Sequence, residues 1–363
     1  MTTWKTQLER VSQRLRERIL APTPYDIHYV NFAVTFLCNS RCRMCDIWEI
    51  YRGRGAAART ELSLAEIERV FTSPLFGRLR SVSLTGGEVF LRRDFAEIVG
   101  FFLGQFPRAT ITIPTGSINP ELNAQTLRRI MRDYRPEKGR IFLSVSLDGI
   151  GATHDHQRGI RVFDKAMRVI EDALSLDGLR VGVSFTITRD NWRDLLGVYR
   201  FAREKGIEFS AQFVHSSETY YAMTHSPTGW RREDLQMIEH ALKQITADMM
   251  ARMSLRQRVT DVRAYYFHRM VDYQSHPRRI FTCYSGTHSF YLDPYGNVYP
   301  CITLNKKLGN VRERRFEDIW LSSEAQAIRQ QIAARRCECW TPCEALPSLG
   351  RSPKPLLFNL TRR

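Results

Sequence analysis

The sequence predicts an α/β fold, a partial (β/α)6 barrel followed by a small C-terminal, cysteine-bearing domain. Three observations support this prediction. Short runs rich in β-branched residues alternate with helical patterns through the first 215 residues. The eight cysteines fall into two groups, with none between residues 45 and 283. After residue 280 the alternation gives way to a hairpin pattern and a cysteine-rich stretch.

Length and composition set the first bounds. A chain of 363 residues can form one large domain, or one large and one small. No apolar run reaches the ~18 residues of a membrane span, and no secretory signal begins the chain. We therefore expect a cytoplasmic protein, whose thiols stay reduced. The net charge of +16 favours an acidic partner or a solvated basic surface, and no specific nucleic-acid motif accompanies it.

Residues 1–27 form an N-terminal extension, and within it residues 3–20 are expected to form an amphipathic helix that ends at Pro22. Its apolar face carries Trp4, Leu8, Val11, Leu15 and Ile19. Its basic face carries Lys5, Arg10, Arg14, Arg16 and Arg18. Two interpretations remain open. The helix covers the bottom of the barrel, or it lies peripherally on an anionic membrane surface.

Residues 28–215 are expected to form the barrel core. The six predicted strands lie at 28–36, 80–84, 110–114, 140–147, 180–187 and 207–214. Helical patterns separate them at 63–71, 93–106, 123–134, 163–176 and 192–206. Parallel strands need such helical crossovers, and six repeats of the alternation favour a TIM-like barrel or partial barrel.

The pattern changes after residue 215. Residues 216–280 are expected to form a helical connection, with long helices between 230 and 274. Residues 281–363 form the predicted second domain. It begins with a hairpin at 281–301, whose turn is "DPYGN", and continues with one helix at 316–336 that leads into the last cysteines.

The first cysteine group, Cys38, Cys42 and Cys45, follows directly on the first predicted strand. This loop belongs to the C-terminal face of the barrel, where such folds keep their active sites. A structural zinc ion takes four protein ligands. Three thiolates with one open position instead suit a [4Fe–4S] cluster whose fourth iron binds an exchangeable ligand.

The Cx3Cx2C spacing after the first strand resembles the signature of the radical S-adenosylmethionine (SAM) superfamily. The resemblance implies that SAM itself fills the missing position through its amino and carboxylate groups. In that family the cluster reduces SAM, and the resulting 5′-deoxyadenosyl radical abstracts hydrogen from a substrate. The three cysteines would then be catalytic, and an external one-electron donor of the flavodoxin or ferredoxin type is implied as a partner.

Other positions agree with this resemblance. Gly86, Gly87 and Glu88, in "SLTGGEVFL", are similar to the family's GGE motif, which holds the amino group of SAM. Two glycines let backbone approach a ligand, and a carboxylate attracts an ammonium group. The triplet alone also fits a tight turn. Met44 stands between two of the cysteines, where the family has a bulky residue near adenine.

The stretch "LSVSLDGIGATHDHQRG" resembles a further family motif. Ser146 and Asp148, at the end of the fourth strand, suit polar contacts to ribose or substrate. Arg158 is implied as the partner of the SAM carboxylate, because a guanidinium can grip it with two bonds. The alternative is an ordinary surface arginine. The resemblance covers residues 28–215 in order.

The second group contains Cys283 and Cys301, on either side of the hairpin, and Cys337, Cys339 and Cys343 in "CECWTPC". It resembles the auxiliary-cluster domains called SPASM, or Twitch in the short form. Five cysteines replace the usual seven, which favours one auxiliary [4Fe–4S] cluster. We expect Cys283, Cys301, Cys339 and Cys343 as ligands, because a CxC pair is cramped for two ligands of one cube. Cys337 in place of Cys339, or a zinc ion with four cysteines, remain alternatives.

The "VHSSETYY" stretch after the sixth strand contains weaker candidates for substrate contact, which are equally explained as loop surface: His215, Ser217, Glu218 and Tyr220.

The function predicted from the sequence is that of a radical SAM enzyme. It would abstract hydrogen from an unidentified substrate and so oxidise, dehydrogenate or cross-link a sugar, a lipid-linked molecule or a peptide. The auxiliary cluster would accept an electron or anchor the substrate. The basic charge favours an anionic or lipid-linked substrate. The alternative is a non-catalytic iron–sulfur or zinc-binding protein on a degenerate barrel.

Overall fold

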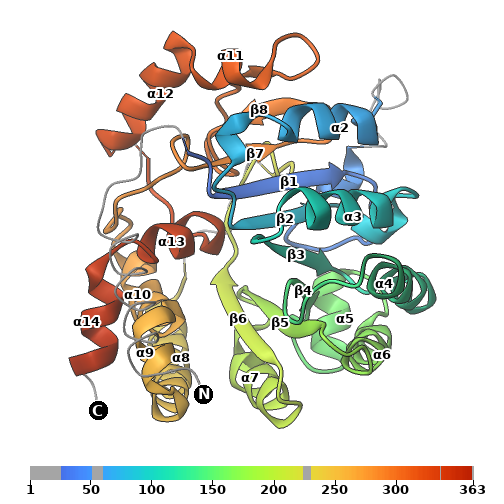
Figure 1. The fold of residues 1–363 in the computed structure, drawn as a ribbon. Helices are drawn as coiled ribbons and strands as arrows, with labels where there is room; N and C mark the ends of the chain where they lie inside the picture. Colours follow the sequence, from blue (N-terminus) through green and yellow to red (C-terminus); the bar gives the residue numbers. More distant parts are fainter. Residues whose placement is uncertain (1–25, 51–59, 224–229, 336, 362–363) are drawn as a thin grey trace, which may run out of the picture.

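The computed structural model describes residues 26–50, 60–223, 230–335 and 337–361, and Figure 1 shows their arrangement. The helix predicted at 3–20 lies outside these residues, so both interpretations of it stay predictions. Within the described ranges, no helix has the length and apolar character needed to cross a membrane.

One nine-stranded sheet organises the molecule, in the order β6-β5-β4-β3-β2-β1-β7-β8-β9. The first six strands are parallel and occupy the six predicted runs: β1 (Tyr29–Thr35), β2 (Ser81–Gly86), β3 (Thr110–Thr115), β4 (Ile141–Ser146), β5 (Arg180–Ile187) and β6 (Glu208–Phe213). Strands β1 and β6 do not pair with each other, because β1 pairs with β7 instead. The predicted partial (β/α)6 barrel is therefore confirmed.

Helices connect the parallel strands and cover their outer side (Figure 1). They are α2 (Leu64–Phe71), α3 (Phe95–Gln105), α4 (Pro120–Tyr134), α5 (Ala152–Arg158), α6 (Phe163–Leu174) and α7 (Leu195–Glu204). Local sequence explains their ends. Ser63 and Glu66 form a reciprocal capping box at the start of α2, and Asn119 caps α4. The apolar stripe of α2, including Ile67 and Phe71, is buried in the core.

The predicted helical connection consists of α8 (Arg232–Arg252), α9 (Leu255–Thr260) and α10 (Arg263–Ser275). The C-terminal part contains β7 (Ser289–Leu292), β8 (Asn297–Tyr299), β9 (Gly309–Asn310), α11 (Phe316–Trp320), α12 (Ser323–Ala333), α13 (Pro342–Leu349) and α14 (Pro353–Thr361). The single helix predicted at 316–336 is thus two helices. They separate where the Ser322 side chain caps α12 through the backbone N–H of Ala325.

The predicted hairpin, β7 and β8, extends the barrel sheet. Strand β7 runs parallel to β1, with Tyr29 opposite Ser289 and Phe32 opposite Leu292. Cys283 therefore precedes the N-terminal end of β7. Strand β8 is antiparallel to β7, so Cys301, which follows β8, lies toward the same end of the strands. The first cysteine group follows the C-terminal end of β1. The two groups consequently lie toward opposite ends of the strands.

Gly86, the last residue of β2, and Gly87 allow the backbone to pass close to the end of β1. Gly86 has φ +135°, and a Cβ atom on it would lie 1.9 Å from the carbonyl oxygen of Thr35. A Cβ on Gly87 would lie 2.2 Å from the oxygen of Leu37. Both overlaps involve backbone, which cannot move away cheaply. The two glycines therefore place the Glu88 loop against the end of β1.

Replacing Gly86 with alanine should destabilise the protein by about 3 kcal/mol or more, because the overlap and the backbone strain add. Gly104 is the matched control. It lies in α3, and nothing stands within 4 Å of a Cβ placed on it, so Gly104→Ala should be neutral or stabilise by about 0.5–1 kcal/mol. Thermal melting of both variants checks this. Equal melting temperatures would show that the β1–β2 contact tolerates a side chain.

Candidate active site

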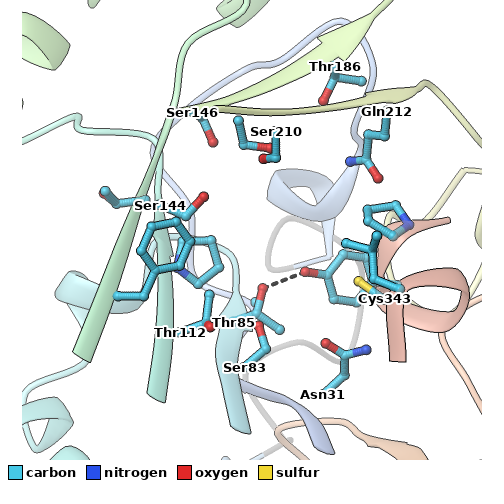
Figure 2. A pocket seen from close by; sticks show the side chains of 18 of the residues that line it. Asn31, Ser83, Thr85, Thr112, Ser144, Ser146, Thr186, Ser210, Gln212 and Cys343 are labelled. Atoms are coloured by element: carbon cyan, nitrogen blue, oxygen red, sulfur yellow. Dashed lines mark hydrogen bonds between the residues drawn. The ribbon is translucent and has the colours of Figure 1, made fainter. Parts of the chain in front are cut away.

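A cavity of about 720 Å³ lies inside the barrel. Its lining includes the three cysteines of the first group and, from the other end of the strands, His28 and His288. A strand rises about 3.3 Å per residue, so the seven residues of β1 separate these two ends by roughly 20 Å. Figure 2 shows side chains from several strands pointing into this space.

The first cysteine group lies at the end of β1. Burial, with a smaller contribution from the neighbouring Cys42, raises the pKa of the Cys38 thiol to about 12. Burial and Cys42 also raise the pKa of Cys45 well above its usual range. All three thiols are half-buried, and a metal cluster bound there would displace their protons and take them as thiolates. The donor set therefore suits an iron–sulfur cluster.

Glu88 faces the cavity from the loop after β2 and is 2% exposed. Its carboxylate accepts hydrogen bonds of 2.9 Å from the Thr115 hydroxyl and from the backbone N–H of Gly116. Burial raises the pKa of Glu88 to about 7, against the lowering effect of these bonds. A buried carboxylate at a cavity wall is suited to an ammonium group, whose charge would favour its ionised form.

Arg158 ends α5 and brings a guanidinium to the same wall, 9% exposed. Its Nη1 lies 3.6 Å from the Cys42 sulfur, and its Nη2 forms a 2.5 Å ion pair with Asp148. Burial alone would lower the pKa of Arg158, but Asp148 and Cys42 raise it above its usual value. The buried Nε atom has no hydrogen-bond partner among the residues that the structure describes. The side chain is thus held charged beside the cysteines.

Asp148 is fully buried behind Arg158. It is not one of the described residues that line the cavity. Its Oδ1 accepts a 2.6 Å hydrogen bond from the backbone N–H of Thr186. This geometry favours a positioning role for Asp148 over the direct ribose or substrate contact expected from the sequence. The other predicted SAM-binding residues all line the cavity: Met44, Gly86, Gly87, Glu88, Ser146 and Arg158.

Hydroxyl groups cover much of the inner barrel wall, a feature that the sequence analysis missed. A filled barrel has bulky branched side chains at such positions. Here the short side chains leave the interior hollow, and two amides add to them (Figure 2). The wall residues are Asn31, Ser83, Thr85, Thr112, Ser144, Ser146, Ser184, Thr186, Ser210 and Gln212. Alternating serine and threonine, as in "SVS" and "TIT", is the sequence signal that could have indicated this wall.

The four weaker candidates for substrate contact, all in the loop after β6, fall into two pairs. Tyr220 and His215 line the cavity, and the Tyr220 hydroxyl is hydrogen-bonded to Thr85, as the dashed line in Figure 2 marks. Ser217 and Glu218 instead bond to Ile302 and Asn305 and so tie the loop to the segment after β8. The structure therefore favours Tyr220 and His215 for substrate contact.

The five cysteines of the second group have different surroundings. Burial, Glu344 and Cys339 raise the pKa of Cys301, and burial followed by Cys283 raises that of Cys339. Cys337 also acts on Cys339 and lies 3.6 Å from Arg279 Nη1. Cys339 thus interacts electrostatically with Cys283, Cys301 and Cys337, although no three His, Cys, Asp or Glu side chains of the described residues are close enough together to hold a single metal ion.

Cys343 faces a different space, although it acts on Tyr266 together with Cys339. It lines the barrel cavity near Asn31 (Figure 2), and burial raises the pKa of its thiol to about 12. Its side chain interacts with Tyr29 and Asn31 of β1. We therefore propose Cys283, Cys301, Cys337 and Cys339 as an alternative to the predicted ligand set, which contains Cys343 instead of Cys337.

Comparison with known proteins identifies both parts of the chain. A family model described as "Radical SAM superfamily" matches residues 32–202, and one described as "Iron-sulfur cluster-binding domain" (SPASM) matches residues 283–344. These matches confirm the resemblances noted from the cysteine spacings.

Three curated relatives illustrate the range of similar proteins. The Fe-coproporphyrin III synthase of Methanosarcina barkeri is 27% identical over 205 residues, which cover 54% of this chain and 46% of the relative. The AdoMet-dependent heme synthase of Oleidesulfovibrio alaskensis is 26% identical, and the match covers 81% of this chain and 74% of the relative. The sporulation killing factor maturation protein SkfB of Bacillus subtilis is 24% identical, and the match covers 84% of this chain and 67% of SkfB. The chain spans about half the length of the first two curated relatives that it matches.

Solved structures share the fold. Streptococcus suis SuiB superposes with a TM-score of 0.56 at 16% identity, covering 90% of this chain and 73% of SuiB. The structure of anSMEcpe with bound AdoMet and a peptide gives a TM-score of 0.57 at 17% identity, covering 82% and 81%.

Proposed function

The chain belongs to the radical SAM superfamily and carries a SPASM-type iron–sulfur domain, and on this premise we propose that it is an enzyme that cleaves SAM reductively and removes hydrogen from a polar substrate inside the barrel. Its cofactors are SAM and [4Fe–4S] clusters. The observation that carries the proposal is the convergence of Cys38, Glu88 and Arg158 at one end of a hydroxyl-lined cavity.

Each group in that end has a separate task. When bound, the cluster and SAM supply the radical that removes a hydrogen atom. Cys38, Cys42 and Cys45 would hold the cluster as thiolates. Glu88 would bind the ammonium of SAM, and Arg158, held by Asp148, its carboxylate. Met44, whose sulfur accepts a 3.2 Å hydrogen bond from Gln157, would pack near the adenine.

The hydroxyl wall supports a substrate rich in hydrogen-bonding groups. Serine and threonine side chains both donate and accept, so they can bind sugar hydroxyls without a charge on either side. A peptide is the second candidate. It is favoured by the similarity to SkfB over most of this chain, and a peptide backbone offers the same donors and acceptors. Isotope-labelled product analysis with sugar and peptide substrates would separate the two.

The second cysteine group supports an electron-transfer role for one auxiliary cluster. Cys283 and Cys301 lie at the end of the barrel opposite to Cys38, so a substrate in the cavity lies between the two cysteine groups. An auxiliary cluster there could accept the electron left after hydrogen removal. An external donor of the flavodoxin or ferredoxin type would supply the electron that cleaves SAM.

Replacing Arg158 with alanine should weaken SAM binding about ten- to a hundredfold, because a charge-assisted contact contributes roughly 1.5–3 kcal/mol. Iron content should stay unchanged, since Arg158 is not a cluster ligand. Arg161, an exposed arginine three residues later, is the matched control, and Arg161→Ala should bind SAM normally. Equilibrium dialysis under anaerobic conditions measures both. Equal SAM affinity in the two variants would show that a residue other than Arg158 binds the carboxylate of SAM.

A further inference from the structure

The end of the cavity farthest from the first cysteine group carries basic groups that SAM binding does not use. His28 directly precedes β1, Arg80 directly precedes β2, and His288 directly precedes β7. Arg351 follows α13. All four residues line the cavity. Segments distant in the sequence therefore bring imidazole and guanidinium groups to one end of the barrel, which we call the basic end.

The basic end is built from defined contacts. The rings of His28 and His288 meet edge to face, with centroids 5.5 Å apart. The Nδ1 atom of His288 lies 2.8 Å from the backbone oxygen of Asp26. The guanidinium of Arg351 lies over the ring of Tyr284, 4.8 Å from its centroid. These contacts hold the side chains in place before any ligand binds.

Two polar atoms of the basic end lack a partner. The Nε2 atom of His28 and the Nη1 atom of Arg351 are buried and make no hydrogen bond with any residue described. Buried polar groups normally have partners, so these two atoms are available to a ligand in the cavity. Arginine can only donate. A ligand at Arg351 must therefore be an acceptor.

The charge balance of the basic end is positive. Burial, Arg351 and His288 lower the pKa of His28 to about 3, and burial lowers that of His288 to about 4. Asp26 is the carboxylate that acts on both histidines, and it already forms a 3.2 Å ion pair with Arg78. Asp26 also acts on Arg351, so one carboxylate faces the three arginines Arg78, Arg80 and Arg351. An anion would supply the missing counter-charge.

We propose that the basic end binds the phosphate group of the substrate, with Arg351 and Arg80 supplying charge and His28 a further hydrogen bond. The inference rests on the proposed function, because it identifies the substrate of the same cavity. A guanidinium fork matches phosphate geometry. The hydroxyl wall lies between the basic end and Cys38, so the substrate is a phosphate ester whose hydroxylated part extends toward SAM.

The test uses reconstituted holoprotein without SAM or turnover, so its result does not depend on the proposed reaction. Isothermal titration calorimetry compares methyl phosphate, inorganic phosphate and acetate. Wild-type protein should bind methyl phosphate, and Arg351→Gln should bind it at least about tenfold more weakly. The matched control is Arg193→Gln. Arg193 also lies over an aromatic ring, 4.4 Å from that of Trp192, but it is not in the cavity wall. The Arg193→Gln variant should bind methyl phosphate as the wild type does.

Iron content reports whether each variant folds. If Arg351→Gln loses iron, Arg80→Gln and Arg351→Lys replace it, and both should weaken binding while retaining iron. Three outcomes would overturn the proposal. They are no binding of methyl phosphate to the wild type, equal binding in the wild type and the basic-end variants, or a preference for acetate. Binding of inorganic phosphate alone would also overturn it, because the site would then hold a free ion.

Discussion

Replacing Cys38, Cys42 and Cys45 together with alanine should abolish SAM cleavage and leave about four of roughly eight irons per chain. The three half-buried thiols belong to the loop after the C-terminal end of β1, and among the described residues Cys343 is the one other cysteine in the cavity wall. The second group lies toward the other end of the sheet, so its iron should remain. Iron analysis and chromatography of 5′-deoxyadenosine measure the two effects.

Two results would contradict this expectation. SAM cleavage by the triple variant would show that the first cysteine group is not needed for catalysis. Zinc in place of the remaining iron would show that the second group forms a zinc site with four cysteine ligands. Alanine at Leu321, an exposed residue between α11 and α12, serves as a control that should retain all iron and full cleavage.

Replacing Cys337 with alanine should remove or degrade the auxiliary cluster, with a loss of up to about four irons, whereas Cys343→Ala should retain about eight. The reason is the position of the two thiols. Cys337 lies with Cys339 and Arg279, while Cys343 faces the barrel cavity beside Asn31. Iron analysis and Mössbauer spectroscopy of both variants make the comparison.

The opposite pattern, iron loss in Cys343→Ala and none in Cys337→Ala, would restore the ligand set expected from the sequence. Loss of iron in both variants would mean that the auxiliary site needs all three C-terminal cysteines. Either result would also change the interpretation of the cavity wall, since Cys343 would then have to turn away from Tyr29 and Asn31.

The barrel and its SAM-binding end could be predicted because their signals are local. Each predicted strand is a short run rich in β-branched residues between turn signals, and the carboxyl ends of parallel strands meet at one edge of the sheet. Cys38, Glu88 and Arg158 were therefore expected to come together once β1, β2 and β4 were parallel strands of one sheet. The partnership of Asp148 with Arg158 was missed because it depends on which way α5 turns after β4.

The remaining features depend on contacts between distant segments. The pairing of β7 with β1 joins residues about 260 positions apart, and nothing in either strand specifies the other. The basic end unites His28, Arg80, His288 and Arg351 for the same reason. The assignment of Cys343 to the auxiliary cluster rests on spacing and stays a prediction; Cys343 is the second residue of α13, and its side chain interacts with Tyr29 and Asn31 of β1.

The most direct test of the proposed function is SAM cleavage by the anaerobically reconstituted wild-type protein. Dithionite supplies the electron, and chromatography with mass detection measures 5′-deoxyadenosine. We predict that 5′-deoxyadenosine forms only when reductant, SAM and the iron-loaded chain are all present. A chain that holds its full iron and binds SAM, yet forms no 5′-deoxyadenosine with dithionite, would contradict the proposal and identify the protein as a non-catalytic iron–sulfur protein.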